Sequence, residues 1–274
     1  MRKNCLLWEI RIANGELVGY LFGTIHISHP EIDSKLYTPL KLLHSTHCLY
    51  LEINPGELDK TFFQGNNDET QIKDLRSFYS KQKYARLKKN LIKFCGINPD
   101  YFRNTNPVVL MSYIEASLSN ASPEKGMDMQ LYLNAKNFGI PVKGLISMEE
   151  EYQSMYQLND QLEGSELYKL SRNLKSAKQN IKRLIKLYKE EDIHQLYRVS
   201  KKPLGAMRKP LLYDRNFKIL EKMKTELQAG EKILVAVGAG HLSGEFGLIR
   251  LLRKEGYKIS PFQTRECSKL KYKS

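Results

Sequence analysis

The chain has 274 residues, of which 41% are hydrophobic, so it can bury a sizeable core. Its 44 Lys and Arg exceed its 30 Asp and Glu, and the net charge of +14 would attract anionic partners. The four cysteines lie far apart and form no CxxC pair, which argues against a zinc knuckle, a thioredoxin-like centre and a disulfide scaffold.

The basic residues are spread along the chain, with mild enrichment at 82–93, at 169–189 and from Lys269 to Lys273. No basic run alternates with aromatic residues in the manner of a nucleic-acid-binding platform. We therefore expect a solvated basic surface that makes weak contacts with anionic surfaces and has no specific nucleic-acid partner.

The N-terminal residues do not resemble a signal peptide, which needs about 7–15 uninterrupted apolar residues. Glu9 and Arg11 interrupt the apolar run that begins at Leu6. No segment approaches the roughly 18 apolar residues of a membrane span. We therefore expect a cytoplasmic protein without a transmembrane segment.

The first half of the chain combines short strands with helices. Asn14-Gly15 joins two β-rich runs and is typical of a tight hairpin. Asn106-Pro107 predicts an N-cap followed by proline at the first helical position. The predicted elements are strands at 6–11 and 17–25, a helix at 33–44, a strand at 48–53, and helices at 82–95 and 107–118.

The second half continues this pattern. Ser147-Met148-Glu149-Glu150 fits a capping box at a helix start. Apolar residues at three-four spacing from Leu167 to Tyr188 predict one long helix, and Ile233 to Val237 indicates a strand buried on both faces. The other predicted elements are a short helix after Gly126-Met127-Asp128, a strand at 141–145, helices at 209–227 and 246–254, and a strand at 257–260.

This order of elements predicts an α/β (α+β) fold, with a central mixed sheet, flanking helices and a helical insertion. The sequence has no repeat and no linker rich in Gly, Ser or Pro. We expect residues 1–274 to form a single domain in which a helical insertion at about 57–205 forms a cap.

Three predicted strands end in side chains that can bind a metal. His26 follows the second strand, Glu52 lies near the end of the third, and His241 comes just after the buried strand. Ligands bind outside the carboxyl ends of strands in open α/β sheets, so these side chains are expected to share one crevice. Two imidazoles and a carboxylate suit a divalent ion that activates water, which indicates hydrolytic chemistry.

Several neighbouring residues are expected to support this site. Gly23 and Gly238 each precede a histidine by three residues, where a missing Cβ allows a tight turn or close backbone approach. Arg215 shares a helix face with apolar residues and therefore needs a carboxylate or an anionic substrate. The residues predicted to bind substrate or to orient the ligands are Gly23, Thr24, Asp128, Asn216, Gly238 and Gly240.

Each of these residues also has a structural interpretation. His26 could be a hydrogen-bonded histidine at a strand end, and Glu52 could pair with Arg215 purely for structure. His241 could cap the next helix, and Arg215 could lie at the edge of the apolar stripe with its head in water. Among the remaining histidines, His29 is the other candidate ligand, because it lies close to His26 in the sequence.

Together with several further motifs, these residues make the chain resemble the TraB/PrgY/GumN family, which includes the Tiki-like metalloproteases. The motifs are spread over almost the whole chain in the family's order. They are Leu21-Phe22-Gly23-Thr24-Ile25-His26, Leu51-Glu52, Gly126-Met127-Asp128, Gly139 to Leu145, Asp214-Arg215-Asn216, Val237 to Glu245, Leu251-Leu252 and Gly256-Tyr257.

The resemblance implies an erythromycin-esterase/ChaN-like fold with an active centre formed by His26, Glu52 and His241. It also implies peptide-bond cleavage that depends on manganese or cobalt, and zinc suits the same residue types. One motif departs from the family: Gly144-Leu145 is followed by Ile146, where relatives often have glutamate. Glu149 or Glu150 could replace that carboxylate.

We therefore weigh three functions. The leading hypothesis is a metal-dependent, peptidase-like hydrolase acting on a peptide or a small molecule, in which Arg215 orients the substrate or its oxyanion. The second is a binding protein that holds a peptide, haem or another ligand in the same crevice without turnover. The third is a regulatory or host-interacting protein that uses its basic surface.

Overall fold

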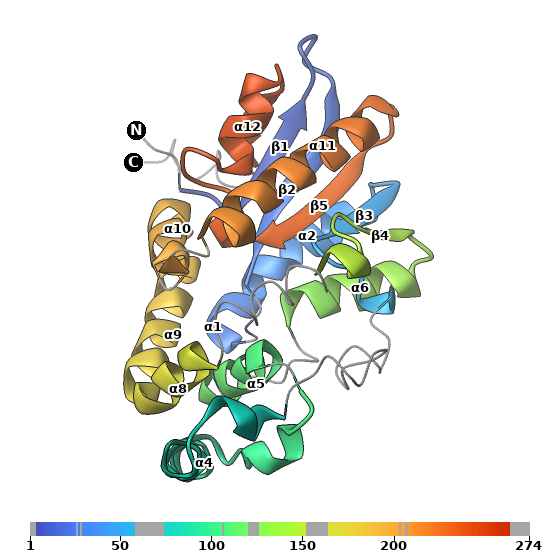
Figure 1. Cartoon of the computed structure of the whole chain (residues 1–274). Coiled ribbons are helices and arrows are strands. Elements are labelled where there is room, and N and C mark those ends of the chain that lie inside the picture. Colours follow the sequence, from blue (N-terminus) through green and yellow to red (C-terminus); the bar gives the residue numbers. More distant parts are fainter. Residues whose placement is uncertain are drawn as a thin grey trace, which may run out of the picture.

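A computed structural model describes residues 4–25, 27, 29–57, 74–105, 107–119, 126–151, 164–202, 204–205 and 208–263 (Figure 1). At its centre is a six-stranded sheet with the order β4-β3-β5-β2-β1-β6. Neighbours among β4, β3, β5 and β2 pair in parallel, while β1 pairs antiparallel with β2 and β6, so the sheet is mixed as predicted. The strands are β1 (Leu7–Arg11), β2 (Leu17–Thr24), β3 (Cys48–Leu51), β4 (Val142–Gly144), β5 (Ile233–Gly238) and β6 (Lys258–Pro261).

The predicted hairpin at Asn14-Gly15 is confirmed. β1 and β2 pair in the register Leu7 with Phe22, and a bulge follows Ile10. Gly15 has φ of 95°, a backbone conformation that a side chain would strain.

β5 is the buried strand that the sequence predicted, and it lies between β3 and β2. Its residues Leu234, Val235 and Ala236 are completely buried. Because β2, β3 and β5 run parallel, the residues that follow these strands all lie at the carboxyl end of the sheet.

Helices cover both faces of this sheet. Figure 1 shows α11 and α12 in front of the strands and α2 behind them. α6 contacts α2, β3 and β4. These helices are α2 (Tyr37–Leu43), α6 (Met127–Asn137), α11 (Arg215–Gln228) and α12 (Leu248–Lys254).

A second group of helices lies beyond the carboxyl ends of the parallel strands (Figure 1). Buried side chains of these helices, such as Leu87 and Ile114, belong to the same hydrophobic cluster as the sheet residues. The helices are α1 (Pro30–Asp33), α4 (Lys81–Cys95), α5 (Pro107–Ser119), α8 (Ser165–Arg172), α9 (Leu174–Lys189) and α10 (Ile193–Lys201). Short 3-10 segments are η1 (Ser34–Leu36), η2 (Pro55–Glu57), η3 (Leu75–Phe78), η4 (Pro99–Phe102) and η8 (Ala239–His241), and η7 (Lys209–Asp214) is a π-helical turn.

The prediction of one long helix over 167–188 is wrong in one respect, because this segment forms two helices, α8 and α9, that meet at Asn173. This residue has φ of −119° and ψ of 26°, and its side-chain amide donates a hydrogen bond to the Lys169 carbonyl. Asparagine disfavours a helix interior because its side chain competes for backbone groups. The apolar spacing continues across the break, so periodicity alone did not reveal it.

The interval 57–205, predicted as a helical insertion, contains β4 in addition to its helices. β4 pairs with β3 and forms one edge of the sheet. The buried hydrophobic residues of the described ranges form one continuous cluster, and a single domain over 1–274 stays a prediction. No helix within the described ranges is both long and apolar enough to cross a membrane.

Candidate functional site

Glu52 lies directly after β3, and its carboxylate contacts two side chains from distant parts of the chain. Its Oε1 accepts a hydrogen bond of 2.7 Å from Nη1 of Arg215. Its Oε2 lies 3.7 Å from Nε2 of His241. The Glu52 side chain is only 12% exposed, so water screens these interactions weakly.

His241 ends the 3-10 turn that follows β5 and is buried. Its Nδ1 lies 2.6 Å from Oδ1 of the buried Asn216. The Asn216 amide nitrogen donates to the backbone carbonyls of Phe246 at 2.6 Å and His241 at 3.3 Å, which fixes Oδ1 as the acceptor for the imidazole. Nδ1 of His241 therefore carries a proton, and in the neutral ring Nε2 has its lone pair on the side of Glu52.

Arg215 begins α11 directly after the π-helical turn η7 (Lys209–Asp214). Turns of this kind inside helices are often found at functional sites. The guanidinium is 14% exposed and bridges two carboxylates, those of Glu52 and Glu151. The predicted need of Arg215 for a carboxylate partner is confirmed, and the Glu52–Arg215 pair considered as a structural alternative is present.

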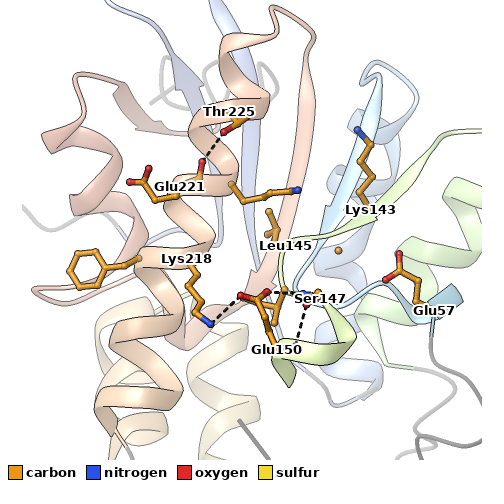
Figure 2. Close-up of a pocket in the computed structure, with 12 residues that line it drawn as sticks. Glu57, Lys143, Leu145, Ser147, Glu150, Lys218, Glu221 and Thr225 are labelled. Carbon is orange, nitrogen blue, oxygen red and sulfur yellow. Dashed lines mark hydrogen bonds and ion pairs between the residues drawn. The ribbon is translucent and has the colours of Figure 1, made fainter. Parts of the chain in front are cut away.

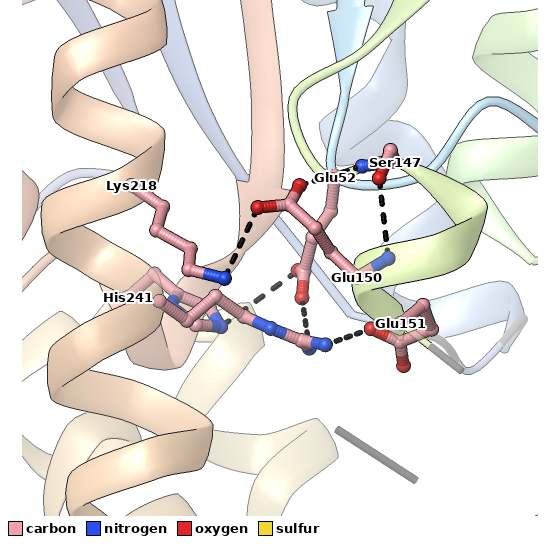
Figure 3. Close-up of polar contacts among 7 residues, drawn as sticks. Glu52, Ser147, Glu150, Glu151, Lys218 and His241 are labelled. Carbon is pink, nitrogen blue, oxygen red and sulfur yellow. Dashed lines mark hydrogen bonds and ion pairs between the residues drawn. The ribbon is translucent and has the colours of Figure 1, made fainter. Parts of the chain in front are cut away.

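Glu151 is a residue of this cluster that the sequence did not identify. Figure 3 shows its side chain pointing towards Glu52 and His241. Of the two predicted replacements for the family's glutamate, Glu149 and Glu150, the latter instead binds Ser147 and Lys218. One feature of the sequence could have indicated Glu151. Because the capping box uses the carboxylate of Glu150, the neighbouring carboxylate of Glu151 is available for other contacts.

The capping box itself is confirmed. The Ser147 backbone N–H donates to Glu150 at 3.0 Å, and the Glu150 N–H donates to the Ser147 hydroxyl at 3.1 Å. These bonds fix the start of the helical residues 148–151, from which Glu151 reaches Arg215. The hydrogen bond from Ser147 and the ammonium of Lys218 hold the pKa of Glu150 below its ordinary value.

Ile146 lies beside the site but contributes no polar side-chain atom. Its backbone N–H donates to the Glu52 carbonyl at 2.9 Å, and its side chain is buried. An apolar residue at this position can neither bind a metal nor accept a hydrogen bond.

Thr24 and Asp128 form a separate contact at the end of β2. The buried Thr24 hydroxyl donates to Oδ1 of Asp128 at 2.9 Å and so joins the end of β2 to the first turn of α6. Close by, the Tyr188 hydroxyl of α9 donates to the Gly23 carbonyl at 2.6 Å. Burial raises the pKa of Tyr188 well above its ordinary value, so its hydroxyl stays protonated.

The three site glycines differ in what surrounds them. A Cβ at Gly23 would lie 2.6 Å from Cδ1 of Leu242 and 3.1 Å from Cα of Ala239, so only glycine lets β2 approach η8 closely. A Cβ at Gly238 would make only ordinary contacts, 3.5 Å from His241 and 3.9 Å from Glu52. A Cβ at Gly240 would meet Ser200 at 3.2 Å, which is tight.

His26, the predicted third ligand, and Asn106, the predicted N-cap, lie outside the described residues. The role of each therefore stays a prediction. His29 caps α1 by accepting a hydrogen bond from the Glu31 N–H. His194 contacts the buried Ser243 hydroxyl at 2.6 Å. Among the described side chains, no three His, Cys, Asp or Glu are grouped to hold a metal.

Glu52 and His241 nevertheless fit two ligands of one cation. Two donor atoms at about 2.1 Å from a tetrahedral ion lie about 3.4 Å apart, close to the observed 3.7 Å. The atoms on the far side of each group, Oε1 of Glu52 and Nδ1 of His241, are hydrogen-bonded to Arg215 and Asn216. Metal ligands are commonly oriented by such outer hydrogen bonds.

An open groove of about 790 Å³ adjoins this cluster (Figure 2). It lies between α11 and the segment from β4 to Glu150. Lys218 and Glu150 contribute to its wall and form an ion pair of 3.0 Å between the two sides. The described lining includes Ile146 but not Glu52 or His241, so the groove is a neighbour of the cluster and does not contain it.

The comparison with protein families matches residues 6–261 to the TraB/PrgY/gumN family. No curated protein and no solved structure matches the chain, so the likeness to the ChaN-type fold stays a prediction. The family match covers every strand of the sheet and each residue of the cluster around Glu52. The chain is therefore a member of the TraB/PrgY/gumN family.

Proposed function

We propose that this protein is a metal-dependent, peptidase-like hydrolase whose centre contains Glu52 and His241, with His26 as the third ligand. The observation that supports it is the pair of facing donor atoms, Oε2 of Glu52 and Nε2 of His241, 3.7 Å apart and weakly exposed. Manganese or cobalt is our first expectation, and zinc suits the same ligand types. When bound, such an ion would lower the pKa of a water molecule and polarise a carbonyl group.

The chain's own residues have separable tasks in this proposal. Asn216 keeps the proton of His241 on Nδ1, which directs the Nε2 lone pair towards Glu52. Arg215 binds Oε1 of Glu52 and leaves Oε2 on the side of His241. Because a guanidinium stays charged, Arg215 can donate hydrogen bonds to negative charge that develops on a substrate oxygen.

Glu151 balances Arg215 in the same cluster. Glu52 and Glu151 both contact the guanidinium, so the two carboxylates share the single positive charge of Arg215. Carboxylate oxygens beside one another favour a bound cation. The adjoining groove of about 790 Å³ between α11 and the segment after β4 is where we place the substrate in this proposal.

Metal content and peptide cleavage test this proposal together. Purified wild type is expected to bind one transition-metal ion per chain and to cleave members of a peptide library. His241→Ala should lose both properties. His47→Ala is the matched control, because His47 is exposed and pairs with Glu231 at 2.9 Å.

The outcomes separate the candidate functions. A wild-type chain that takes up no transition metal at neutral pH excludes the metal hydrolase. Metal or haem binding without cleavage favours the binding protein instead, and a visible absorption titration identifies haem. Equal loss in both histidine variants would point to a general effect on folding.

A further inference from the structure

Two helical segments carry an excess of positive charge equal to the net charge of the whole chain. Residues 81–95 and 167–189 contain 14 of the 44 Lys and Arg and none of the 30 Asp and Glu. The rest of the chain therefore has 30 basic and 30 acidic residues. The charge of +14 belongs to these segments, which form α4, part of α8, and α9.

Three contacts bring the segments together in space. The Asn90 side chain of α4 donates to the Ser171 carbonyl of α8 at 3.0 Å. Nζ of Lys83 lies 6.0 Å from the ring centre of Tyr168. Lys178 of α9 interacts electrostatically with Cys95 of α4: burial raises the pKa of the Cys95 thiol, and the positive charge of Lys178 opposes that rise. The three helices lie together at the end of the molecule away from the β1–β2 hairpin (Figure 1).

Most of these cations have no acidic partner among the described residues. Four of the 14 pair with acids: Lys88 with Asp100, Lys169 with Glu166, Lys186 with Glu190, and Lys189 with Glu31. The other ten are exposed and make no ion pair in the part of the chain that the structure describes. We call these ten the basic surface: Lys81, Lys83, Arg86, Lys89, Lys93, Arg172, Lys175, Lys178, Lys182 and Arg183.

Within each helix, the cations recur on one face. Arg86, Lys89 and Lys93 follow one another at spacings of three and four residues along α4. Lys175, Lys178 and Lys182 do the same along α9. Residues at this spacing are neighbours on a helix, so their charges repel each other unless an anionic partner lies against them.

Exposed apolar side chains accompany the basic surface. Ile92 and Phe94 on α4 are each 46% exposed, and Nζ of Lys93 lies 5.5 Å from the Phe94 ring centre. Tyr101 and Tyr113, from the segments that follow, are also exposed. Half of the eight large exposed hydrophobic side chains in the described residues thus lie between 92 and 113.

We propose that the basic surface binds an anionic phospholipid bilayer, with Ile92 and Phe94 entering the headgroup region. Lysine and arginine on a helix are attracted to anionic headgroups, and neighbouring apolar side chains add affinity by leaving water. Nucleic acid is the rival partner, because the same cations can bind the phosphates of a duplex. The exposed apolar side chains of Ile92 and Phe94 favour the bilayer, since they gain affinity by leaving water. The inference is independent of the proposed hydrolase activity.

Vesicle co-sedimentation of the full chain tests this inference. At about 0.15 M salt, the protein should bind mixed phosphatidylserine–phosphatidylcholine vesicles and not pure phosphatidylcholine vesicles. The variant K89Q/K93Q/K178Q should bind the anionic vesicles on the order of a hundredfold more weakly, at about fivefold for each cation lost. Phe94→Ser should weaken binding several-fold at unchanged charge.

A matched control removes the same charge elsewhere. Lys41, Lys136 and Lys254 are exposed and lie outside the two segments. K41Q/K136Q/K254Q should bind vesicles within about threefold of wild type, because charges beyond a Debye length of about 8 Å are screened. Far-UV circular dichroism and a thermal melt establish that all variants fold.

Three results would overturn the inference. The first is no binding to anionic vesicles at this salt concentration. The second is an equal loss in the two triple variants, which would make the effect one of net charge alone. The third is tighter binding to a DNA duplex than to vesicles together with no effect of Phe94→Ser, which would assign the surface to nucleic acid.

Discussion

Nε2 of His241 lies 3.7 Å from Oε2 of Glu52, although the two residues follow different strands. Adjacent residues at the start of α11 hold the outer sides of this pair: Arg215 binds Glu52, and Asn216 binds His241. The start of a single helix therefore orients both groups.

Asn216→Ala should destabilise the protein and change the tautomer of His241. The substitution leaves the Phe246 carbonyl and the buried Nδ1 of His241 without their present partner. We expect the free energy of unfolding to fall by about 1–3 kcal/mol and any metal affinity to fall about 10–100-fold. Urea unfolding and imidazole nitrogen NMR shifts measure the two effects.

The control for this variant is Asn180→Ala, an exposed position on α9. It should change the free energy of unfolding by no more than about 0.5 kcal/mol. If His241 keeps the same nitrogen shifts in Asn216→Ala, the assigned role of Asn216 is wrong.

Glu151→Gln should cost more stability than Glu149→Gln. Glu151 is 13% exposed and contacts the guanidinium of Arg215, whereas Glu149 is exposed and has no assigned contact in the site. Losing a hydrogen-bonded charge partner of this kind costs about 1–3 kcal/mol, against about 0.5 kcal/mol or less at the surface. Chemical denaturation of both variants gives the comparison, and equal values would remove Glu151 from the cluster.

Gly23→Ala and Gly238→Ala should differ, although both glycines precede a histidine by three residues. The new methyl group at 23 would press on Leu242 and on the Ala239 backbone, and such overpacking costs about 1–3 kcal/mol. At 238 the methyl group meets nothing closer than 3.5 Å, and φ of −51° suits any residue. Thermal melts should show a lowered Tm for Gly23→Ala only; a matching drop in both variants would contradict the packing assigned to Gly23.

Glu150→Gln should change how stability depends on pH. Because the folded-state pKa of Glu150 is lowered, its contribution is present above the ordinary carboxyl value and is lost as the pH falls through the folded value. We expect Glu150→Gln to be slightly less stable than wild type at pH 7, with the difference vanishing in acid. The side chain is 38% exposed, so screening keeps the effect small.

Urea midpoints measured from neutral to acid pH check this prediction. Lys218→Gln removes the opposite member of the ion pair and should show the same disappearance in acid. A difference that grows as the pH falls would show that the sign assigned to Glu150 is wrong.

Local sequence patterns predicted the strands and the end of the sheet at which the site lies. The apolar run of β5 and the Asn14-Gly15 turn are local signals, since periodicity and turn chemistry act over a few residues. The same reasoning placed Glu52 and His241 after neighbouring parallel strands, and it gave Arg215 a carboxylate partner. It failed at Asn173, where apolar spacing continued through a helix break.

Which distant groups meet depends on how the helices and strands pack together. No local pattern distinguishes Glu151 from Glu149 or Glu150, because the choice depends on how the helix after β4 faces α11. The meeting of α4 with α8 and α9, which gathers the unpaired cations, depends likewise on packing between segments far apart in the chain. Side-chain contacts of this kind arise from the relative position of elements, and sequence periodicity carries no information about that position.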